Sequence, residues 1–258
     1  MKKIISLILA VAIATLCFVS CGGSTNNESG SSKKETLVMA TNAEFPPYEY
    51  KEGDKFVGID VEIMTAIAED LGMELKIEDM DFDAIIPAVN SGKADIGAAG
   101  MTVTEDRLTS VDFSDTYASA RQVLIVKADS GLDSIEKIQG KKVGTQLGTT
   151  GDIYARDSIE KGGFGEENVE GYSKGYEAVQ ALSQGKVSAV LIDNEPAKVF
   201  VSQVEGLKIL DEAFVEEDYA LCVKKGNSEL LNKVNQSLAK LKQSGKFDEI
   251  VAKYIKAE

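Results

Sequence analysis

Histidine and tryptophan are both absent from this chain of 258 residues. Without imidazole there can be no Ser-His or Cys-His nucleophile pair and no His-ligated zinc site. The chain also lacks the one side chain whose ordinary pKa lies near neutral pH. Most familiar hydrolase mechanisms are therefore excluded, and we expect a protein that is not an enzyme and uses no metal or cofactor.

Positive charge is scarce as well. The 28 Lys and Arg residues face 42 Asp and Glu residues, which gives a formal net charge of −14. A surface that binds nucleic acid needs clustered Lys and Arg to neutralise phosphates, so DNA and RNA are excluded as partners. The remaining composition, 43% hydrophobic and 27% charged, is that of a soluble globular protein. Its length suits two lobes of about 100 to 130 residues each.

The long uncharged run of this chain lies at its N-terminus. Lys2 and Lys3 precede a mainly apolar stretch from Ile4 to Val19. This stretch is shorter than the ~20 residues that span a bilayer as a helix. The pattern is typical of an export signal. We therefore expect residues 1–20 to be removed as a signal peptide and the protein to lie outside the cytoplasm.

Cysteine is rare, with three residues in the chain. Cys21 follows the apolar run and is bounded by Ser20 and Gly22, an arrangement that resembles the lipobox of bacterial lipoproteins. On this interpretation Cys21 carries fatty acyl chains such as palmitate, which anchor the protein to the cell membrane. Phe18 stands where Leu is usual, so a simple secretory signal is the alternative. Residues 21–34 form the lipidated start and a flexible tether rich in Gly, Ser and Asn.

Cys222 is the one cysteine left for the folded part, so it has no partner for an intramolecular disulfide. It lies in the short apolar run Tyr219–Val223. We expect a buried strand thiol, because a reactive thiolate needs a basic neighbour and the chain has no histidine.

Apolar periodicity alternates between strand and helix along the chain, which indicates an α/β fold. Ile63, Ile67 and Leu71 lie four residues apart and end at Gly72, which predicts a helix over 60–71. Pro87 is tolerated only in the early turns of a helix predicted over 83–90. Strands are predicted at 37–40, 75–77, 94–98, 122–127, 142–145, 188–193 and 219–223, and further helices at 150–160, 176–183 and in two segments near the C-terminus.

Several short motif matches carry no function. Gly171–Gly175 fits the nucleophile-elbow pattern, but its Ser needs a histidine base. Asp79, Asp81 and Asp83 have the spacing of a calcium loop, yet Ala84 stands where that loop requires Gly. The phosphate-binding glycine motifs are absent from the sequence. Phosphate, calcium and acyl-transfer chemistry are therefore not favoured.

The remaining polar and aromatic residues suit the binding of a zwitterion, a ligand that carries one positive and one negative charge. Phe45 and Phe82 follow predicted strands, where an open α/β sheet places its ligand crevice. Arg107 ends a loop rich in hydroxyl residues, and a guanidinium can hold a carboxylate with two parallel hydrogen bonds. The segment Gly148–Gly151, which contains Thr150, joins a strand to a helix start and either offers N–H donors to an anion or holds an ordinary Thr N-cap. Asp193 ends a strand and is either an ammonium acceptor or a helix cap.

These segments, taken in order, resemble the extracytoplasmic solute-binding proteins of polar amino acid ABC transporters, the family 3 type. The similarity covers nearly all of the chain after the tether. It rests on five linked motifs: Ala40–Tyr48, Phe56–Asp60, Met80–Phe82, Gly100–Arg107 and Asp112–Tyr117.

The resemblance implies a two-lobed clamshell of the type II periplasmic-binding-protein fold. Lobe 1 would comprise residues 35–118 and 219–258, and lobe 2 residues 119–218. Two crossing strands would form the hinge, near Tyr117–Arg121 and Glu217–Ala220. Closure on a free amino acid, followed by delivery to an ABC permease, is the implied function of a monomer.

The resemblance also implies which residues surround the ligand side chain. Phe45 and Phe82 match aromatic residues that sandwich it. Ala99 and Gln146 fall at wall positions that vary with specificity. Asn42 occupies a position where some relatives that prefer basic ligands carry a carboxylate. The ligand is thus implied to be either a glutamine-like polar or an arginine- or lysine-like basic amino acid.

The two charged ends of the ligand are assigned by the same resemblance. Gly100 and Thr102 match residues that hold the α-ammonium, with Asp193 as its acceptor. Arg107 matches the carboxylate clamp, and Thr150 a second carboxylate donor. A cyclohexadienyl-type dehydratase or a ligand-sensing domain on the same fold is the alternative, in which Glu44 would supply an acid-base group.

Overall fold

The computed structural model describes residues 34–256. The predicted signal peptide, Cys21 and nearly all of the predicted tether lie outside the described residues. Among the helices that are described, none combines the length and the apolar character needed to cross a membrane.

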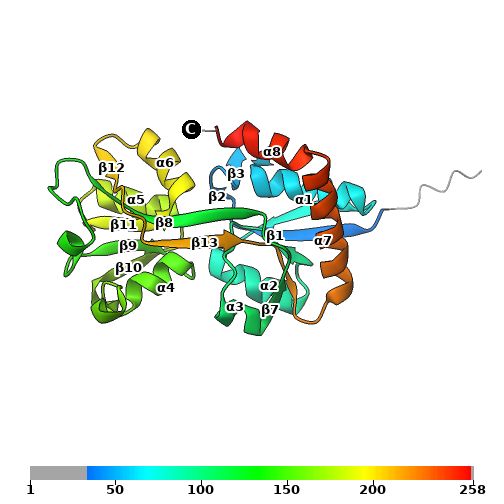
Figure 1. Cartoon of the computed structure of the whole chain (residues 1–258), viewed down its shortest axis with the longest axis horizontal. Helices are drawn as coiled ribbons and strands as arrows, with labels where there is room; N and C mark the ends of the chain where they lie inside the picture. The colour runs from blue at the N-terminus through cyan, green and yellow to red at the C-terminus, as the bar shows by residue number, and fades with distance from the viewer. Residues whose placement is uncertain (1–33, 257–258) are drawn as a thin grey trace, which may run out of the picture. The chain divides into compact units, whose positions relative to one another are not determined.

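Two lobes, each a sheet flanked by helices, lie side by side (Figure 1). We call lobe 1 the part built on a five-stranded sheet in which β1 runs parallel to β5 and β6. Its strands, in order across the sheet, are β5 (Glu74–Asp79), β1 (Thr36–Thr41), β6 (Ile96–Gly97), β14 (Cys222–Lys224) and β7 (Val111–Phe113).

Helices from both ends of the described chain pack in lobe 1 (Figure 1). They are α1 (Ile59–Asp70), α2 (Ile85–Ser91), α3 (Glu105–Ser110), α7 (Ser228–Gln243) and α8 (Lys246–Tyr254), with a 3₁₀ turn η1 (Phe82–Ala84). A separate three-stranded sheet is made of β2 (Glu44–Phe45), β3 (Glu49–Glu52) and β4 (Lys55–Val57).

Lobe 2 is the part built on a six-stranded sheet. Its strands are β10 (Val169–Tyr172), β9 (Val143–Gln146), β11 (Ala189–Asp193), β8 (Ala118–Lys127) and β12 (Leu207–Ile209), with β13 (Val215–Tyr219) also paired to β8. Its helices are α4 (Thr150–Arg156), α5 (Gly175–Ser183) and α6 (Asn194–Gln203), with 3₁₀ turns η2 (Glu136–Ile138), η3 (Ile159–Lys161) and η4 (Glu166–Asn168).

Two antiparallel strands, β8 and β13, run across the middle of the molecule and connect the lobes (Figure 1). Their register extends from Val215 opposite Gln122 to Tyr219 opposite Ala118. Beyond β13 the chain enters lobe 1, where Cys222 of β14 pairs with Gly97 of β6. Each strand therefore has one end near each lobe.

The amphipathic pattern of α1 places its apolar stripe in the core. Ile63 and Ile67 are fully buried there, as their spacing of four residues predicts. Gly58 precedes the helix with φ of 122°, and a Cβ at this position would lie 2.2 Å from the Tyr48 carbonyl oxygen. Only glycine allows the chain to turn this closely past the β2–β3 connection.

Most predicted elements are present, with shifts at their ends. The helix predicted over 83–90 is a 3₁₀ turn followed by α2, which places Pro87 in the first turn of that helix. The strand predicted at 94–98 is only two residues long. The helix predicted over 150–160 ends at Arg156. The strand predicted at 219–223 is wrong, because β13 ends at Tyr219 and β14 begins at Cys222 as the chain changes sheets.

Cys222 is a buried strand thiol, as predicted. Its side chain is fully buried in β14 and forms no disulfide. Burial raises the pKa of the thiol to about 12, which keeps it protonated and unreactive at neutral pH.

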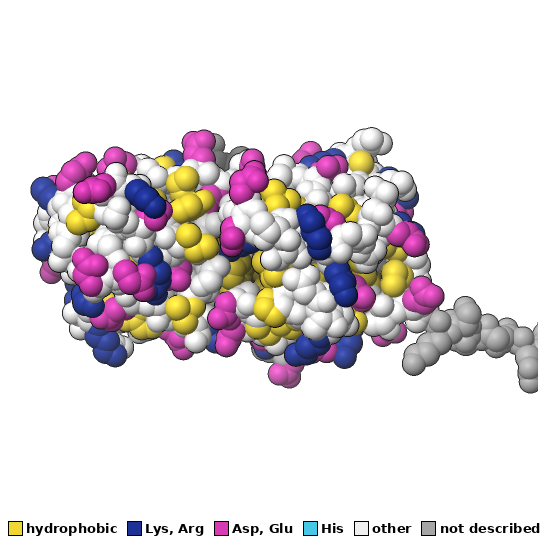
Figure 2. Space-filling model, turned by 90° about the horizontal axis from the view of Figure 1, so that it is seen from below, with side chains coloured by type: hydrophobic (Ala, Val, Ile, Leu, Met, Phe, Trp, Pro, Cys, Tyr) yellow, Lys and Arg dark blue, Asp and Glu magenta, His cyan; other side chains and the backbone are white. Residues whose placement is uncertain are grey.

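The face shown in Figure 2 carries Lys, Arg, Asp and Glu side chains interspersed, with acidic groups more numerous than basic ones. Interspersed charge of this kind offers no basic stripe along which a phosphate backbone could lie.

Candidate functional site

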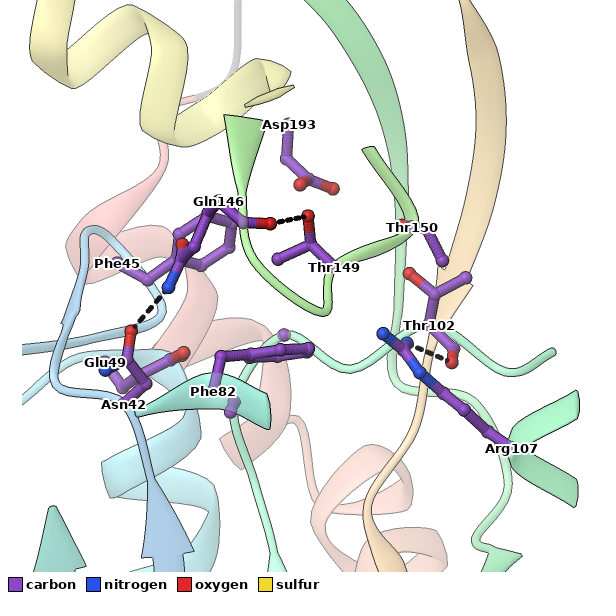
Figure 3. Close-up of a pocket in the computed structure, with 12 residues that line it drawn as sticks. Asn42, Phe45, Glu49, Phe82, Thr102, Arg107, Gln146, Thr149, Thr150 and Asp193 are labelled. Carbon is purple, nitrogen blue, oxygen red and sulfur yellow. Dashed lines mark hydrogen bonds between the residues drawn. The ribbon is translucent and has the colours of Figure 1, made fainter. Parts of the chain in front are cut away.

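All nine residues predicted to contact a ligand line one cavity (Figure 3). Lobe 1 and lobe 2 both contribute to its wall. The lining residues of lobe 1 are Asn42, Phe45, Glu49, Phe82, Ala99, Gly100, Thr102 and Arg107, and those of lobe 2 are Gln146, Thr149, Thr150 and Asp193.

Arg107 reaches the cavity from the first turn of α3. The Thr104 hydroxyl caps this helix by accepting the Arg107 backbone N–H. Arg107 Nη1 donates to the Thr102 carbonyl at 2.8 Å, and Nη2 donates to the Gly148 carbonyl of lobe 2 at 3.1 Å. Because a guanidinium carries five N–H donors, these two bonds fix its plane and leave others for an anion.

Arg107 is buried and packs against an aromatic ring of the cavity wall. Its guanidinium carbon lies 5.3 Å from the centre of the Phe82 ring. Burial lowers the pKa of Arg107 from its ordinary value, although the charges of Glu217 and Asp193 act in the opposite direction. The guanidinium stays charged, because its ordinary pKa is far above neutral.

Aromatic rings form another part of the wall. Phe45 lies in β2 and packs against Tyr48 with the ring centres 6.1 Å apart. Gly100 adopts φ of 51°, and a Cβ there would lie 3.0 Å from the Phe45 ring. Glycine at this position therefore lets the backbone and the ring approach closely, and both face the cavity.

Asp193 is the lobe 2 carboxylate of the cavity. It occupies the N-cap position of α6, yet its side chain forms no capping bond. Instead it accepts a hydrogen bond from the Tyr219 hydroxyl and another from Gln122 Nε2 at 2.9 Å. Burial, with the nearby charge of Glu217, raises the pKa of Asp193 to about 7, against the effect of those two donors.

The Thr102 hydroxyl is already engaged by a neighbouring carboxylate. It donates to Glu217 Oε2 at 3.1 Å, and Gln122 Nε2 donates to the same oxygen at 3.0 Å. Gln122 thus bridges Asp193 and Glu217. Thr102 lies in the wall as predicted, but its hydroxyl is aimed at Glu217.

Thr149, rather than Thr150, caps helix α4. Its hydroxyl accepts the Asp152 backbone N–H at 3.2 Å and donates to the Gln146 carbonyl. Thr150 is the first residue of the helix and is buried against the cavity. The segment Gly148–Gly151 thus holds an ordinary Thr N-cap, at Thr149, while the Thr150 hydroxyl lies 3.5 Å from Gln122 Nε2.

Amide side chains meet across the cavity from the two lobes. Gln146 Nε2 donates to Asn42 Oδ1 at 2.9 Å, and Asn42 Nδ2 donates to the Met80 carbonyl (Figure 3). Ala99 adds a small apolar wall position. This part of the cavity is polar but uncharged.

Three lining residues were not among those predicted to contact a ligand: Asn42, Glu49 and Thr149. For Asn42 the family resemblance predicts an influence on specificity but no ligand contact. Nothing in the local sequence separates Glu49 from its more exposed neighbours Glu44 and Glu52. Thr149 stands one residue before the predicted helix, where a capping hydroxyl is ordinary.

The cavity has the chemistry of a binding site for a small polar molecule. Within residues 34–256, no cluster of three or more Cys, Asp or Glu side chains is arranged to hold a metal ion. A guanidinium and a buried carboxylate face the cavity from different elements, with aromatic and amide side chains between them (Figure 3).

Known proteins resemble this chain over its whole folded part. At the level of sequence, it is 34% identical to the arginine-binding extracellular protein ArtP of Bacillus subtilis over 260 residues, which cover 100% of both chains. It is 33% identical to the ABC transporter glutamine-binding protein GlnH of the same organism over 275 residues, covering 100% of this chain and 99% of that protein.

Solved structures of amino acid-binding proteins have the same fold as this chain. An ancestral arginine-binding protein bound to glutamine superposes with a TM-score of 0.80 at 42% identity, covering 87% of this chain and 99% of that one. A model of the bacterial extracellular solute-binding proteins, family 3, matches residues 37–257. The chain is therefore a member of the family 3 bacterial extracellular solute-binding proteins, a binding protein with the two-lobed type II fold rather than an enzyme.

Proposed function

We propose that this protein captures a free polar or basic L-amino acid outside the cytoplasmic membrane and delivers it to an ABC permease by closing its two lobes. The observation that carries the proposal is the cavity itself. It joins a buried guanidinium of lobe 1 to a buried carboxylate of lobe 2. A free α-amino acid carries the two complementary charges.

A zwitterion loses its hydration when it enters such a cavity. That loss is tolerable only if each charge is paired and hydrogen-bonded. In the proposal the ligand carboxylate binds Arg107, with Thr150 as a second donor. The ligand ammonium binds Asp193, beside the Gly100–Thr102 backbone. These two ends hold the amino acid part common to every ligand.

The ligand side chain would lie between Phe45 and Phe82 and reach the amide groups of Asn42 and Gln146. Ala99 leaves room beside it. Aromatic faces favour a planar or cationic group, and amide oxygens accept its N–H donors. Arginine and glutamine both end in a planar group with N–H donors. The named relatives include proteins for each of them, and an ancestral arginine-binding protein has been solved with either ligand.

Closure follows from the distribution of these groups over two lobes. A ligand has all its contacts only when the lobes are together, so binding shifts an equilibrium from open to closed forms. We assign the hinge to the β8 and β13 segments near Tyr117–Arg121 and Glu217–Ala220. The corresponding lobe boundaries are 35–118 with 219–258, and 119–218.

Membrane attachment belongs to the same proposal. Processing after residue 20 would leave Cys21 as a lipidated first residue, and residues 21–34 as a tether. The folded part would then act as a monomer close to its permease. Mass spectrometry of the membrane fraction would show an acylated N-terminal peptide, which Cys21→Ala would abolish together with membrane retention.

Ligand screening tests the central claim. The chain from residue 22 onward would be unfolded and refolded to remove bound ligand, then heated with each of the twenty amino acids, ornithine, citrulline and cystine. Ligand at 100 times its dissociation constant stabilises the folded state by about 2.7 kcal/mol. A shift of several degrees confined to a few polar or basic amino acids supports the proposal. No shift with any of them contradicts it.

A further inference from the structure

Two buried carboxyl groups meet behind the cavity wall. Glu49 of β3 lines the cavity with an exposed fraction of 1%, and Asp60 of α1 is fully buried. Asp60 Oδ2 accepts the Gly100 backbone N–H and the Tyr117 hydroxyl, each at 2.8 Å. The Asp60 carboxylate thus anchors the backbone of a cavity residue.

The other oxygens of this pair have no ordinary donor. Glu49 Oε2 and Asp60 Oδ1 are both buried, and neither accepts an N–H or hydroxyl hydrogen bond from any described residue. The Asp60 backbone N–H donates to the carbonyl of Tyr48, the residue before Glu49, at 2.9 Å, so the two carboxyl groups are close neighbours whose charges act on each other. Two carboxylates have no hydrogen to share, so a hydrogen bond that satisfies both oxygens requires a proton on one of them.

The proton belongs to Glu49. Asp60 has two donors that stabilise its negative charge, Gly100 and Tyr117. Burial, together with the charges of Asp60 and Asp193, raises the pKa of Glu49 well above its usual range. Burial raises the pKa of Asp60 only to about 6, because its hydrogen bonds act in the opposite direction. The donors and the directions of both pKa shifts therefore favour a proton on Glu49 and a negative charge on Asp60.

We infer that the Glu49 carboxylic acid and the Asp60 carboxylate form a proton-sharing pair that positions two walls of the ligand cavity. One wall is Gly100, whose N–H Asp60 accepts. The other is Phe45, which stands directly opposite Glu49 in the β2–β3 pair. The shared proton holds these walls together, and both residues act as positioning residues behind the ligand.

The surroundings make this proton necessary. The titratable groups that act on the pair are Tyr48 beside Glu49, Tyr117 before β8, and Asp193 at the end of β11. All three are acids. Without the proton, two like charges would lie in contact among further acids, in a buried place where repulsion is poorly screened. We expect the two walls to separate in that state.

Three substitutions test the pair, with L-arginine and L-glutamine as probes for the ligand of the proposed function. Glu49→Gln keeps a donor that cannot be lost, and should bind within about threefold of wild type. Glu49→Leu leaves Asp60 Oδ1 unpaired and should bind about tenfold more weakly or worse. Glu52→Gln, on the exposed end of the same strand, is the matched control and should change nothing.

Alkaline pH gives a second readout. Over the alkaline range in which the protein stays folded, wild type should lose affinity relative to Glu49→Gln, because only wild type can lose the shared proton. The ligand ammonium titrates equally in both measurements, so the ratio of the two dissociation constants removes its contribution. A ratio that stays constant over this range overturns the inference.

Infrared spectroscopy detects the proton directly and needs no ligand. Near pH 8 wild type should show the carbonyl-stretch band of a protonated, buried carboxyl group. The band should persist in Asp193→Asn and vanish in Glu49→Gln. Its absence from wild type, its persistence in Glu49→Gln, or wild-type affinity in Glu49→Leu overturns the inference. If the band is present but no amino acid binds, the proposed function fails while the shared proton stands.

Discussion

The two charged ends of the cavity are supported in different ways. The guanidinium end lies in lobe 1, where Arg107 is held by the Thr102 carbonyl and packed on Phe82. The carboxylate end lies in lobe 2, but Asp193 is held by Gln122 of β8 and Tyr219 of β13. One end is therefore built within a lobe, whereas the other depends on the strands that connect the lobes.

This difference bears on how the protein responds to movement. In the proposed closure mechanism, a rotation about β8 and β13 would leave the Thr102 and Phe82 contacts of Arg107 in place and would break its bond to Gly148 of lobe 2. The same rotation acts directly on the donors that surround Asp193. We therefore expect the carboxylate end to report the conformational state, and the guanidinium end to supply most of the binding energy.

Removal of the guanidinium should have the largest effect. Arg107→Ala should weaken binding of the ligand found in the screen by about 100-fold or more, because a buried ligand carboxylate is left unpaired. Calorimetric titration measures the loss. Arg107→Lys keeps the charge but not the two parallel donors, so its affinity should lie between that of wild type and that of Arg107→Ala. Affinity of Arg107→Ala within about threefold of wild type would contradict the clamp assignment, provided its circular dichroism matches wild type.

Removal of the carboxylate should have an intermediate effect. Asp193→Asn should weaken binding about tenfold to 100-fold, since it loses the charge but keeps an oxygen acceptor. Wild-type affinity should rise as pH increases from about 5 to about 8, because Asp193 with a pKa of about 7 must be ionised to pair with an ammonium. The variant should lack this part of the rise. An identical pH profile in both proteins would place the ammonium elsewhere.

The free protein gives a complementary test with the opposite sign. The pKa of Asp193 is raised on folding, so between its unfolded value and about pH 7 the folded state holds more protons. The free energy of unfolding must then fall as pH rises through this window. Asp193→Asn should remove part of this decrease in the free energy of unfolding. Near pH 8 the variant should therefore be more stable than wild type, by on the order of 2 kcal/mol in that free energy. Denaturant titrations at two pH values measure it.

Removal of the salt bridge between Lys174 of lobe 2 and Glu44 of lobe 1 should have the smallest effect on ligand binding. Lys174 at the start of α5 pairs with Glu44 of β2, and both side chains are about one third exposed. Such a pair contributes at most ~1 kcal/mol, so Lys174→Met should weaken ligand binding about two- to fivefold and abolish part of its salt dependence. Lys142, paired with Glu170 within lobe 2, is the matched control. An equal effect of Lys142→Met would show that closure does not use the Lys174 pair.

Local pattern predicted those elements whose core contacts repeat along the chain. Helix α1 begins one residue before its predicted start. It could be predicted because Ile63 and Ile67 belong to an apolar stripe that any packing partner would bury. The three-stranded sheet β2–β4 was not predicted, since its strands are two to four residues long and largely polar. The break after Tyr219 also escaped prediction, because the apolar run continues while the chain passes from one sheet to the other.

Motif order identified the cavity residues that stand at strand ends and helix starts. Gln146 and Asp193 are the last residues of β9 and β11, Arg107 lies in the first turn of α3, and all three line the cavity. Glu49 and Gln122 could not be found in this way. Their importance comes from partners distant in sequence: Glu49 meets Asp60 on another element, and Gln122 meets Asp193 and Glu217.

The sequence by itself determined the family, the two-lobed α/β fold and the nine residues that were expected at one site. It could do so because five linked motifs, in their order along the chain, resemble a known family and imply its fold and its ligand-contacting positions. Only the tertiary structure decided what each group touches: that Thr102 faces Glu217, that Thr149 caps α4, and that Glu49 and Asp60 each keep a buried oxygen without a donor among the described residues. Burial and pairing set the charge of a carboxyl group, and both arise only when distant segments come together.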